Sequence, residues 1–253
     1  RTGYNPDKKF SPEALQADYR IFRGVLESAH PSLYWYTPKD SMDYYFNKGY
    51  SALKDSMTEM QFRTKLSYVI SKINCGHTSV KASRAYIRYI DTAEEKTFPF
   101  ALKFWSDSMV VTVNLRRNDP EFRRGTILKS INGYDARELT DTLFNYITTD
   151  GYSLCGKFQA LSTDFTFASL FRHVLGMTDS MDVHYLDDQG IEKQAYVYPY
   201  DFRADTMYKI HPHPDGKKRK IPSSKLIYFS PANLQLDTGL KTAFMTLATF
   251  DPG

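Results

Sequence analysis

The stretch that decides the fold of this chain is Gly125-Thr126-Ile127-Leu128-Lys129-Ser130-Ile131-Asn132-Gly133. Thr126 to Ile131 predicts a β-strand, because it is a short run with several β-branched residues. Asn132-Gly133 predicts a tight turn directly after the strand, since both residue types accept the left-handed backbone that such turns need. A helix is predicted next, from about Asp135 to Ile147. Strand, turn and helix in this order place a module of mixed structure in the middle of the chain.

Further elements flank this stretch on both sides. Met109 to Leu115 is rich in β-branched residues and predicts an upstream strand. Downstream, a helix is predicted around Thr163 to Leu175, closed by Gly176. Met181 to Leu186 and Ile191 to Tyr198 predict a β-hairpin. The middle of the chain therefore combines strands and helices.

The first third of the chain predicts three helices. Ser11-Pro12 marks the first start, with Ser as N-cap and Pro at the first helical position. Pro31 ends this helix, and Thr37-Pro38 starts the second helix in the same way. Thr58-x-x-Gln61 is a capping box that starts the third helix.

Sequence signals also mark the end of the third helix and the C-terminal part of the chain. The third helix is expected to end with Gly76 as its left-handed C-cap, and a short strand, Thr78 to Lys81, is expected to follow. Residues 201–241 are expected to form a linker. Thr242 to Phe250 predicts a strand that is apolar on both faces and belongs inside a larger sheet. The turn signal Asp251-Pro252-Gly253 leads us to expect that the natural chain continues.

Composition limits the class of protein. The chain has 253 residues, which suffices for one large or two modest domains, and 42% of them are hydrophobic. The 19 Tyr and 17 Phe are too many for a disordered chain. A net charge of +4 is mild and does not by itself indicate nucleic-acid binding. No run of about 18 apolar residues occurs, so no transmembrane segment is predicted. Cys75 and Cys155 permit one disulfide, although two free buried thiols are the simpler interpretation.

Three motifs in the helical front occur in a recognisable order. They are Leu15-x-x-Asp18-Tyr19-x-x-Phe22, His30-Pro31-x-Leu33-Tyr34 and Gly76-His77-Thr78. Together they resemble the N-terminal helical region of the tail-specific, or C-terminal-processing, serine peptidases. Cys75 stands where that family has the aspartate of its Asp-Gly-His-Thr segment.

The middle of the chain resembles the PDZ-like module of the same family. Gly125 to Gly133 is similar to its Gly-x-x-Ile-x-x-Ile-Asn-Gly element, and residues 135–147 fit its groove helix. Asp150-Gly151-Tyr152 resembles the Asp-Gly element that follows the groove helix. Thr242 to Phe250 is similar to the first strand of the catalytic domain.

The resemblance implies an α+β fold: an N-terminal three-helix region, a PDZ-like β-rich module, and the first strand of an α/β peptidase domain. The implied domains are a helical domain at 1–85, a PDZ-like domain at 95–200, a linker at 201–241 and the start of a truncated catalytic domain at 242–253.

The implied parent protein is a serine endopeptidase of the tail-specific type that cleaves polypeptides. Its serine nucleophile would be activated by a lysine base, which must be desolvated to stay neutral. Both residues lie downstream of Phe250 in the family, so no catalytic residue is expected in this chain, and the chain alone is expected to be inactive. No cofactor or metal is implied. The expected partner is a polypeptide substrate or peptide C-terminus, and the expected location is extracytoplasmic, in a bacterial periplasm or lipid-anchored to the cell envelope.

A peptide-binding groove is the one functional surface that the resemblance assigns to this chain. PDZ modules add an extended peptide to a sheet edge, and the groove helix supplies an apolar pocket. The residues expected to bind peptide are Phe98, Phe100, Ala101, Leu102, Leu139 and Leu143. Pro99 removes one donor N–H from the loop that would hold a carboxylate. The module is therefore expected to act mainly as a scaffold or gate.

Two other candidates for catalysis are weaker. Ser51-x-x-Lys54 has the Ser-x-x-Lys spacing of penicillin-binding proteins, but it lies in the last turn of an amphipathic helix. No Gly-x-Ser-x-Gly nucleophile elbow occurs. Three roles are open for His77: a triad base, a metal ligand, or a buried or hydrogen-bonded structural histidine. The structural role is favoured because no partner lies at useful spacing.

Three composition-based candidates also have simpler interpretations. His211-Pro212-His213-Pro214-Asp215 resembles a metal-binding tract, but alternating prolines splay its side chains. The run Lys217 to Lys220 suggests contact with nucleic acid or anionic lipid, and a solvated loop fits better. Tyr34-Trp35-Tyr36 and Tyr44-Tyr45-Phe46 suggest a sugar or peptide platform, and core and interdomain packing is favoured.

Three hypotheses therefore stand. The leading one is the substrate-presenting N-terminal part of a serine endopeptidase. The alternative is a non-catalytic, PDZ-like peptide-binding or adaptor protein. A binding module for another ligand, such as a glycan, rests only on the abundance of Tyr and Trp.

Overall fold

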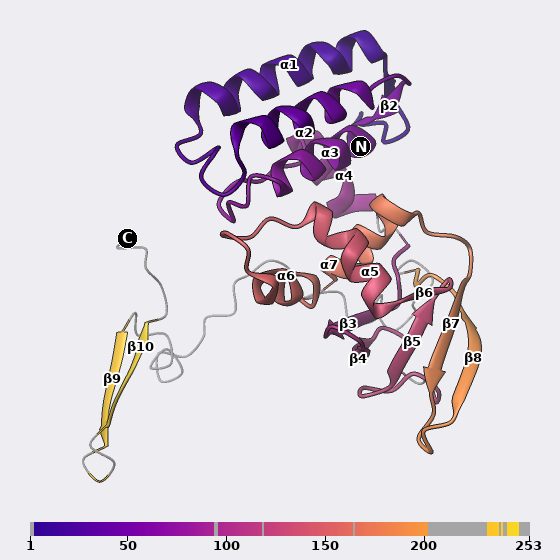
Figure 1. Ribbon diagram of the computed structural model, residues 1–253. Helices are drawn as coiled ribbons and strands as arrows, with labels where there is room; N and C mark the ends of the chain where they lie inside the picture. Colours follow the sequence, from indigo (N-terminus) through magenta and orange to yellow (C-terminus); the bar gives the residue numbers. More distant parts are fainter. Residues whose placement is uncertain are drawn as a thin grey trace. The chain divides into compact units, whose positions relative to one another are not determined.

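The computed structural model describes residues 3–93, 96–117, 119–163, 165–201, 232–237, 239 and 242–247 (Figure 1). The chain divides into two compact units, Arg1–Asp205 and Thr206–Gly253. The first unit holds two hydrophobic cores, one formed by the helical front and one by the sheet and its covering helices.

The helical front contains α1 (Pro12–Ala29), α2 (Lys39–Ser51) and α3 (Glu59–Ser71), which lie side by side in Figure 1. A short antiparallel pair, β1 (Lys9–Phe10) with β2 (Met57–Thr58), joins the starts of α1 and α3. The predicted caps of α1 and α3 are confirmed. Ser11 Oγ accepts a hydrogen bond from the Ala14 N–H, and the Thr58–Gln61 capping box is made in both directions.

Three local predictions in the front are wrong. The N-cap of α2 is Pro38 without a side-chain hydrogen bond, because the Thr37 hydroxyl donates instead to the Lys72 carbonyl after α3. The left-handed residue after α3 is Asn74, with φ 58°, and not Gly76. Residues 78–81 form no strand, and an unpredicted helix, α4 (Arg84–Ala93), follows them.

The first core fixes the spacing of α1, α2 and α3. It includes Tyr19, Phe46 and Val69, each at most 1% exposed. The Tyr19 hydroxyl donates a 2.9 Å hydrogen bond to the Phe46 carbonyl, so the phenol is satisfied although it is buried. Gly49 of α2 faces the same ring, and a side chain there would lie 2.3 Å from the Tyr19 oxygen. The close contact of these helices therefore depends on the missing side chain.

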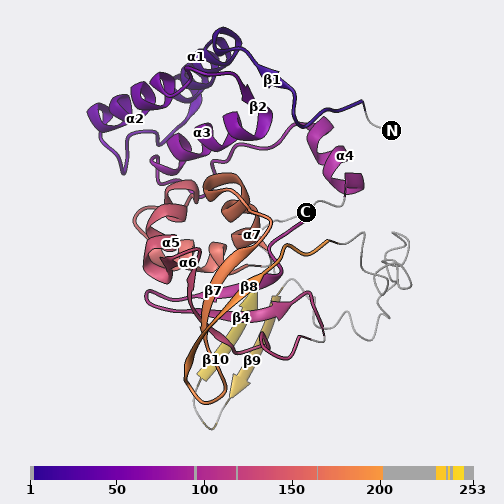
Figure 2. The same ribbon diagram turned by 90° about the vertical axis from the view of Figure 1, so that its right-hand side faces the viewer.

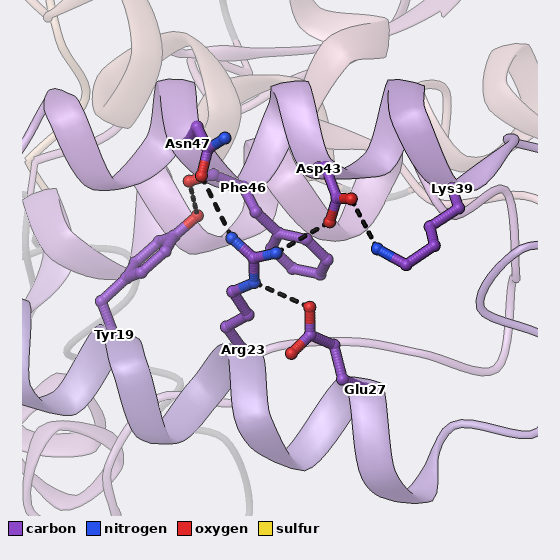
Figure 3. A network of polar contacts seen from close by, with 7 residues as sticks. All are labelled: Tyr19, Arg23, Glu27, Lys39, Asp43, Phe46 and Asn47. Carbon is purple, nitrogen blue, oxygen red and sulfur yellow. Dashed lines mark hydrogen bonds and ion pairs between the residues drawn. The ribbon is translucent and has the colours of Figure 1, made fainter.

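A polar network on the outside of α1 and α2 adds to this contact (Figure 3). The Arg23 guanidinium bonds Glu27 at 2.8 Å, Asp43 at 2.7 Å and Asn47 at 3.1 Å. It also lies over the Phe46 ring, 4.9 Å from the ring centre. Because several partners hold one planar cation, the network favours a single register of α1 against α2.

The second region is an antiparallel sheet with strand order β3-β4-β5-β7-β8. Its strands are β3 (Phe100–Phe104), β4 (Met109–Asn114), β5 (Ile127–Ile131), β7 (Met181–Leu186) and β8 (Glu192–Val197). A short strand, β6 (Tyr134–Asp135), pairs with β5 across Asn132 and Gly133, whose φ values are 50° and 80°. The predicted strand, tight turn and β7–β8 hairpin are therefore confirmed.

Short helices cover the sheet. They are α5 (Ala136–Leu143), the 3₁₀ turn η1 (Phe144–Tyr146), α6 (Leu154–Leu161), α7 (Thr166–Leu170) and the π-helical turn η2 (Phe171–Leu175). In both views, α5, α6 and α7 lie between the sheet and α1–α3 (Figures 1 and 2). The predicted helix at 135–147 is shorter than expected. Gly176, with φ 83°, ends η2 as predicted. The helix α6 was not predicted from the sequence.

In the described part of the second unit, β9 (Ala232–Asp237) pairs antiparallel with β10 (Thr242–Leu247). The predicted strand from Thr242 is confirmed as far as Leu247. β9 lies within the C-terminal part of the predicted linker at 201–241. The mixed α+β class is confirmed, and the domain boundaries stay predictions. No helix in the described part of the chain has the length and apolar character needed to cross a bilayer.

Candidate functional site

The six residues predicted to bind peptide are all buried, and all of them except Ala101 belong to the second core. Each is at most 4% exposed. They are Phe98, Phe100, Ala101, Leu102, Leu139 and Leu143. The apolar side chains that the strand and the helix contribute are packed into the core and do not form an open surface. Peptide binding by these residues stays a prediction.

The free edge of β3 lies next to α6. The Phe104 N–H donates a 3.0 Å hydrogen bond to Ser162 Oγ just after α6, and Lys103 Nζ bonds Gln159 Oε1 at 3.2 Å. One edge donor of β3 is thus already satisfied within the chain. An added peptide strand would have to displace this contact at the C-terminal end of β3.

An open cavity lies on the outer side of α5, and it is the candidate functional site. Its volume is about 650 Å³, and it lies among α5, α6 and the β3–β4 turn. Its lining residues are Ser106, Asp107, Lys129, Asp135, Arg137, Thr140, Asp141, Phe144, Leu154 and Phe158. Both charge signs and three apolar side chains occur together, and ligand pockets likewise combine apolar side chains with a few polar groups.

Helical spacing explains how this cavity is built. Arg137, Thr140, Asp141 and Phe144 follow the i, i+3, i+4, i+7 spacing and so share one face of α5 and η1. Phe144 meets Phe158 of α6 edge to face, with 4.9 Å between ring centres. The prediction from sequence selected the opposite face of α5 because that face is the apolar one.

His77 is not the buried structural histidine that was favoured. It is exposed, and it has no hydrogen-bond partner among the described residues. The residues on either side of His77 are held in place by hydrogen bonds. The Gly76 N–H donates to Asp150 Oδ1 at 2.7 Å, and Thr78 Oγ1 lies 2.8 Å from His30 Nε2. His77 therefore stands exposed on an anchored segment.

Ser51 and Lys54 do not form a catalytic pair. Ser51 is the last residue of α2, and its hydroxyl donates a 2.7 Å hydrogen bond to the Asn47 carbonyl. Both side chains are exposed. A lysine base needs desolvation to be neutral, and this position does not provide it.

The other candidates have mixed outcomes. Within the described ranges, no group of three or more His, Cys, Asp and Glu residues could hold a metal ion. The histidines at 211 and 213 and the run Lys217 to Lys220 lie outside the described residues. Core packing is right for Phe46 but wrong for Trp35 and Tyr44, which are 78% and 59% exposed. The thiols of Cys75 and Cys155 are free, as favoured, but neither is fully buried.

The junction between the helical front and the second region holds three basic side chains whose pKa values are lowered. Burial lowers the pKa of Lys157, and burial together with Lys157 and Lys48 lowers the pKa of Lys72. Burial, with smaller contributions from Arg172 and Arg63, lowers the pKa of His173 to about 4. Sequence patterns do not reveal these groups, because the two regions that bury them are distant in the chain.

Comparisons with known proteins give a match in fold. No protein-family profile and no curated protein matches the sequence. A crystal structure of a CPAF variant with a serine-to-alanine substitution aligns with 75% of this chain, at a TM-score of 0.51 and 14% identity. Structures of mature CPAF, alone and complexed with lactacystin, align with 74% of the chain, at TM-scores of 0.46 and 0.49 and identities of 15% and 13%.

CPAF is the Chlamydia protease-like activity factor, a serine protease of the tail-specific type. The match with the serine-to-alanine variant shows a shared fold over the aligned part. That part is 34% of the variant's chain, and the other two matches cover 34% and 35% of theirs. This chain thus spans about a third of the length of the CPAF structures that it matches.

Proposed function

We propose that this chain is the N-terminal, substrate-presenting part of a serine endopeptidase of the tail-specific type. The observation that supports the proposal most is the fold shared with the CPAF variant, a serine protease, over 75% of this chain and 34% of that one. The catalytic serine and its base, a lysine by resemblance, would lie C-terminal to residue 253.

The chemistry of acyl transfer supports this division. A serine nucleophile needs a base within hydrogen-bond reach, and a lysine base must also be desolvated. Among the described residues, the one Ser-x-x-Lys candidate is exposed at both positions. We therefore propose that these 253 residues bind and present the polypeptide and do not cleave it.

The cavity beside α5 is the proposed presenting surface. Arg137 is exposed at its rim and Leu154 of α6 is 60% exposed, so the cavity offers both a charge and apolar contact. Ligand pockets combine such apolar contacts with polar groups that fix the orientation of the ligand. A polypeptide held here would be supplied to a catalytic domain that follows β10.

The test compares the 253-residue chain with a longer product of the same gene. Hydrolysis of fluorescein-labelled casein and labelling by a fluorophosphonate serine probe are measured for both. We expect the short chain to show neither and the longer chain to show both, with loss of both when the labelled serine is changed to alanine. Hydrolysis by the short chain, or an inactive and unlabelled longer chain, would contradict the proposal.

A non-catalytic peptide-binding protein is the second candidate, and the cavity favours it because the cavity belongs to this chain alone. It predicts that the 253-residue chain binds peptides in titration calorimetry and that Arg137→Ala weakens this binding. It further predicts that the longer gene product binds peptides but shows no hydrolysis. Hydrolysis by the longer product would therefore exclude this candidate.

A further inference from the structure

Two lysines from separate elements lie over the ring of Tyr68, and a third lysine lies close to one of them. Lys72, the C-cap of α3, places its ammonium group 4.7 Å from the centre of the Tyr68 ring and 5.5 Å from that of Tyr45. Lys48 of α2 lies over the same Tyr68 ring at 5.5 Å. Lys157 of α6 belongs to the same cluster, because its ammonium group bonds Phe144, the residue next to the Asn145 that Lys72 bonds. We call these three residues the lysine cluster.

Neutral oxygens hold two of the ammonium groups in place. Lys72 Nζ donates to Asn145 Oδ1, and Lys157 Nζ donates to the Phe144 carbonyl at 2.9 Å. Asn145 is itself fixed, since its side-chain N–H groups donate to the Asp141 carbonyl at 2.7 Å. The charges are therefore positioned before any ligand arrives, which lowers the entropy cost of binding one.

The cluster is short of negative charge. In the described part of the chain, no ion pair joins Lys48, Lys72 or Lys157 to a carboxylate, and no carboxylate contributes to the shifted pKa of any of them. The C-terminal ends of α3 and α5 contribute about half a negative charge each. Three ammonium groups against these two ends leave roughly two positive charges without a partner. Lys72 and Lys157 are half-buried, and like charges in such positions are costly unless a counter-charge joins them.

We propose that the lysine cluster binds an acidic segment of a polypeptide, with side-chain carboxylates seated on Lys72 and Lys157. Two features favour a peptide over a small oxyanion. The three ammonium groups come from α2, α3 and α6, so they suit a ligand with more than one carboxylate. The aromatic rings beside them, including Tyr44 at 59% exposure, offer apolar contact that a free phosphate cannot use. The proposal goes beyond the proposed function and does not depend on it, because this chain alone suffices for the test.

The first experiment measures binding by fluorescence anisotropy at low salt. The probe is a fluorescein-labelled peptide rich in Asp, Glu and Tyr, with both ends blocked, and the reference is the same peptide with Asn and Gln. We expect the acidic peptide to bind at least about tenfold more tightly. We expect the double variant Lys72→Gln/Lys157→Gln to lose about tenfold in affinity. The control Lys54→Gln/Lys81→Gln removes the same charge at two exposed positions and is expected to lose less than about twofold.

A second measurement locates the peptide on the cluster without substitution of its lysines. Lysines are methylated with ¹³C, which keeps their charge, and each pKa is followed by NMR with and without the acidic peptide. We expect the pKa values of Lys72 and Lys157 to rise on binding, because a nearby carboxylate favours the charged form. Unchanged pKa values, or equal loss of affinity in both double variants, would overturn the proposal. So would inorganic phosphate that displaces the peptide at an equal concentration, since the site would then hold a small oxyanion only.

Discussion

The backbone N–H of Gly76 donates a 2.7 Å hydrogen bond to Oδ1 of Asp150, and this bond joins the end of the helical front to the loop before α6. The neighbouring residues make a second bond, from the Gly151 N–H to the Asn74 carbonyl at 2.9 Å. Both partners of the first bond belong to motifs that resemble the tail-specific peptidases. The two motifs are therefore halves of one contact, although 74 residues separate them.

Asp150→Ala is expected to lower the free energy of unfolding by about 1 kcal/mol, because a charge-assisted hydrogen bond is lost. Asp150→Asn keeps an oxygen acceptor and is expected to cost less. Urea denaturation gives the stabilities, and hydrogen exchange at the Gly76 amide gives the local effect. Asp188→Ala, at a carboxylate that is 94% exposed, is the control and should be nearly neutral. Equal effects of Asp150→Ala and Asp188→Ala would show that the bond does not stabilise the junction.

Gly49→Ala is expected to destabilise the helical front by about 1–3 kcal/mol. The added Cβ would lie 2.3 Å from the Tyr19 hydroxyl oxygen and 2.8 Å from Val69 Cγ2. Thermal unfolding measures the effect. Tyr19→Phe removes the nearest clashing atom, so the double variant should lose less stability than the sum of the two single variants.

Gly24→Ala is a matched glycine-to-alanine change that is expected to raise the stability of the protein. Gly24 lies in the interior of α1, and nothing lies within 4 Å of the position of an added Cβ. Because alanine is the better helix former, this variant should gain about 0.5–1 kcal/mol in the same thermal assay. If it destabilises the protein as much as Gly49→Ala does, the contact between Gly49 and Tyr19 is not the cause of that loss.

Signals that act within a few residues could be predicted from the sequence. The Ser11 cap, the Thr58–Gln61 capping box and the Asn132-Gly133 turn each depend on groups that lie close in the chain, and each is present. The helix α6 was missed although Ser153 caps it by accepting a hydrogen bond from the Gly156 N–H. That serine was a usable signal, but a helix of eight residues leaves too short an apolar pattern to detect.

Contacts between distant segments could not be predicted in the same way. Leu139 and Leu143 form an apolar stripe on α5, and such a stripe looks the same in sequence whether it lines a groove or fills a core. The structure buries both residues completely, and the cavity lies on the opposite face around Arg137 and Phe144. The partners of Lys72 and Lys157 depend in turn on how the two regions pack together.

The two cysteines are expected to react as free thiols without reductant. Cys155 is exposed and Cys75 is partly buried, so a thiol reagent such as DTNB should modify Cys155 faster. Cys155→Ser should remove the fast phase and leave the slow one. If no thiol reacts until a reductant is added, the two residues are paired in solution.

Because of His173, the free energy of unfolding is expected to decrease in mild acid. It lies on the π-helical turn η2, and burial lowers its pKa from the ordinary 6.5 to about 4. Between these two values the unfolded chain binds a proton that the folded protein does not. Stability from this group is therefore complete above pH 6.5 and is lost as the pH falls toward 4. The loss is on the order of 2–3 kcal/mol.

Urea denaturation above pH 6.5 and near pH 4 checks this, because the two conditions bracket the titration. Carboxylates also titrate in this range, so the informative quantity is the difference between the wild type and His173→Gln. The variant keeps a polar side chain but has no titrating ring, and its stability should fall less on acidification. His184→Gln is the control, because His184 lies on β7 among Asp182 and Glu192, which can pair with its charged form. An equal acid-induced loss in the wild type and His173→Gln would show that the junction does not exclude the charged imidazole.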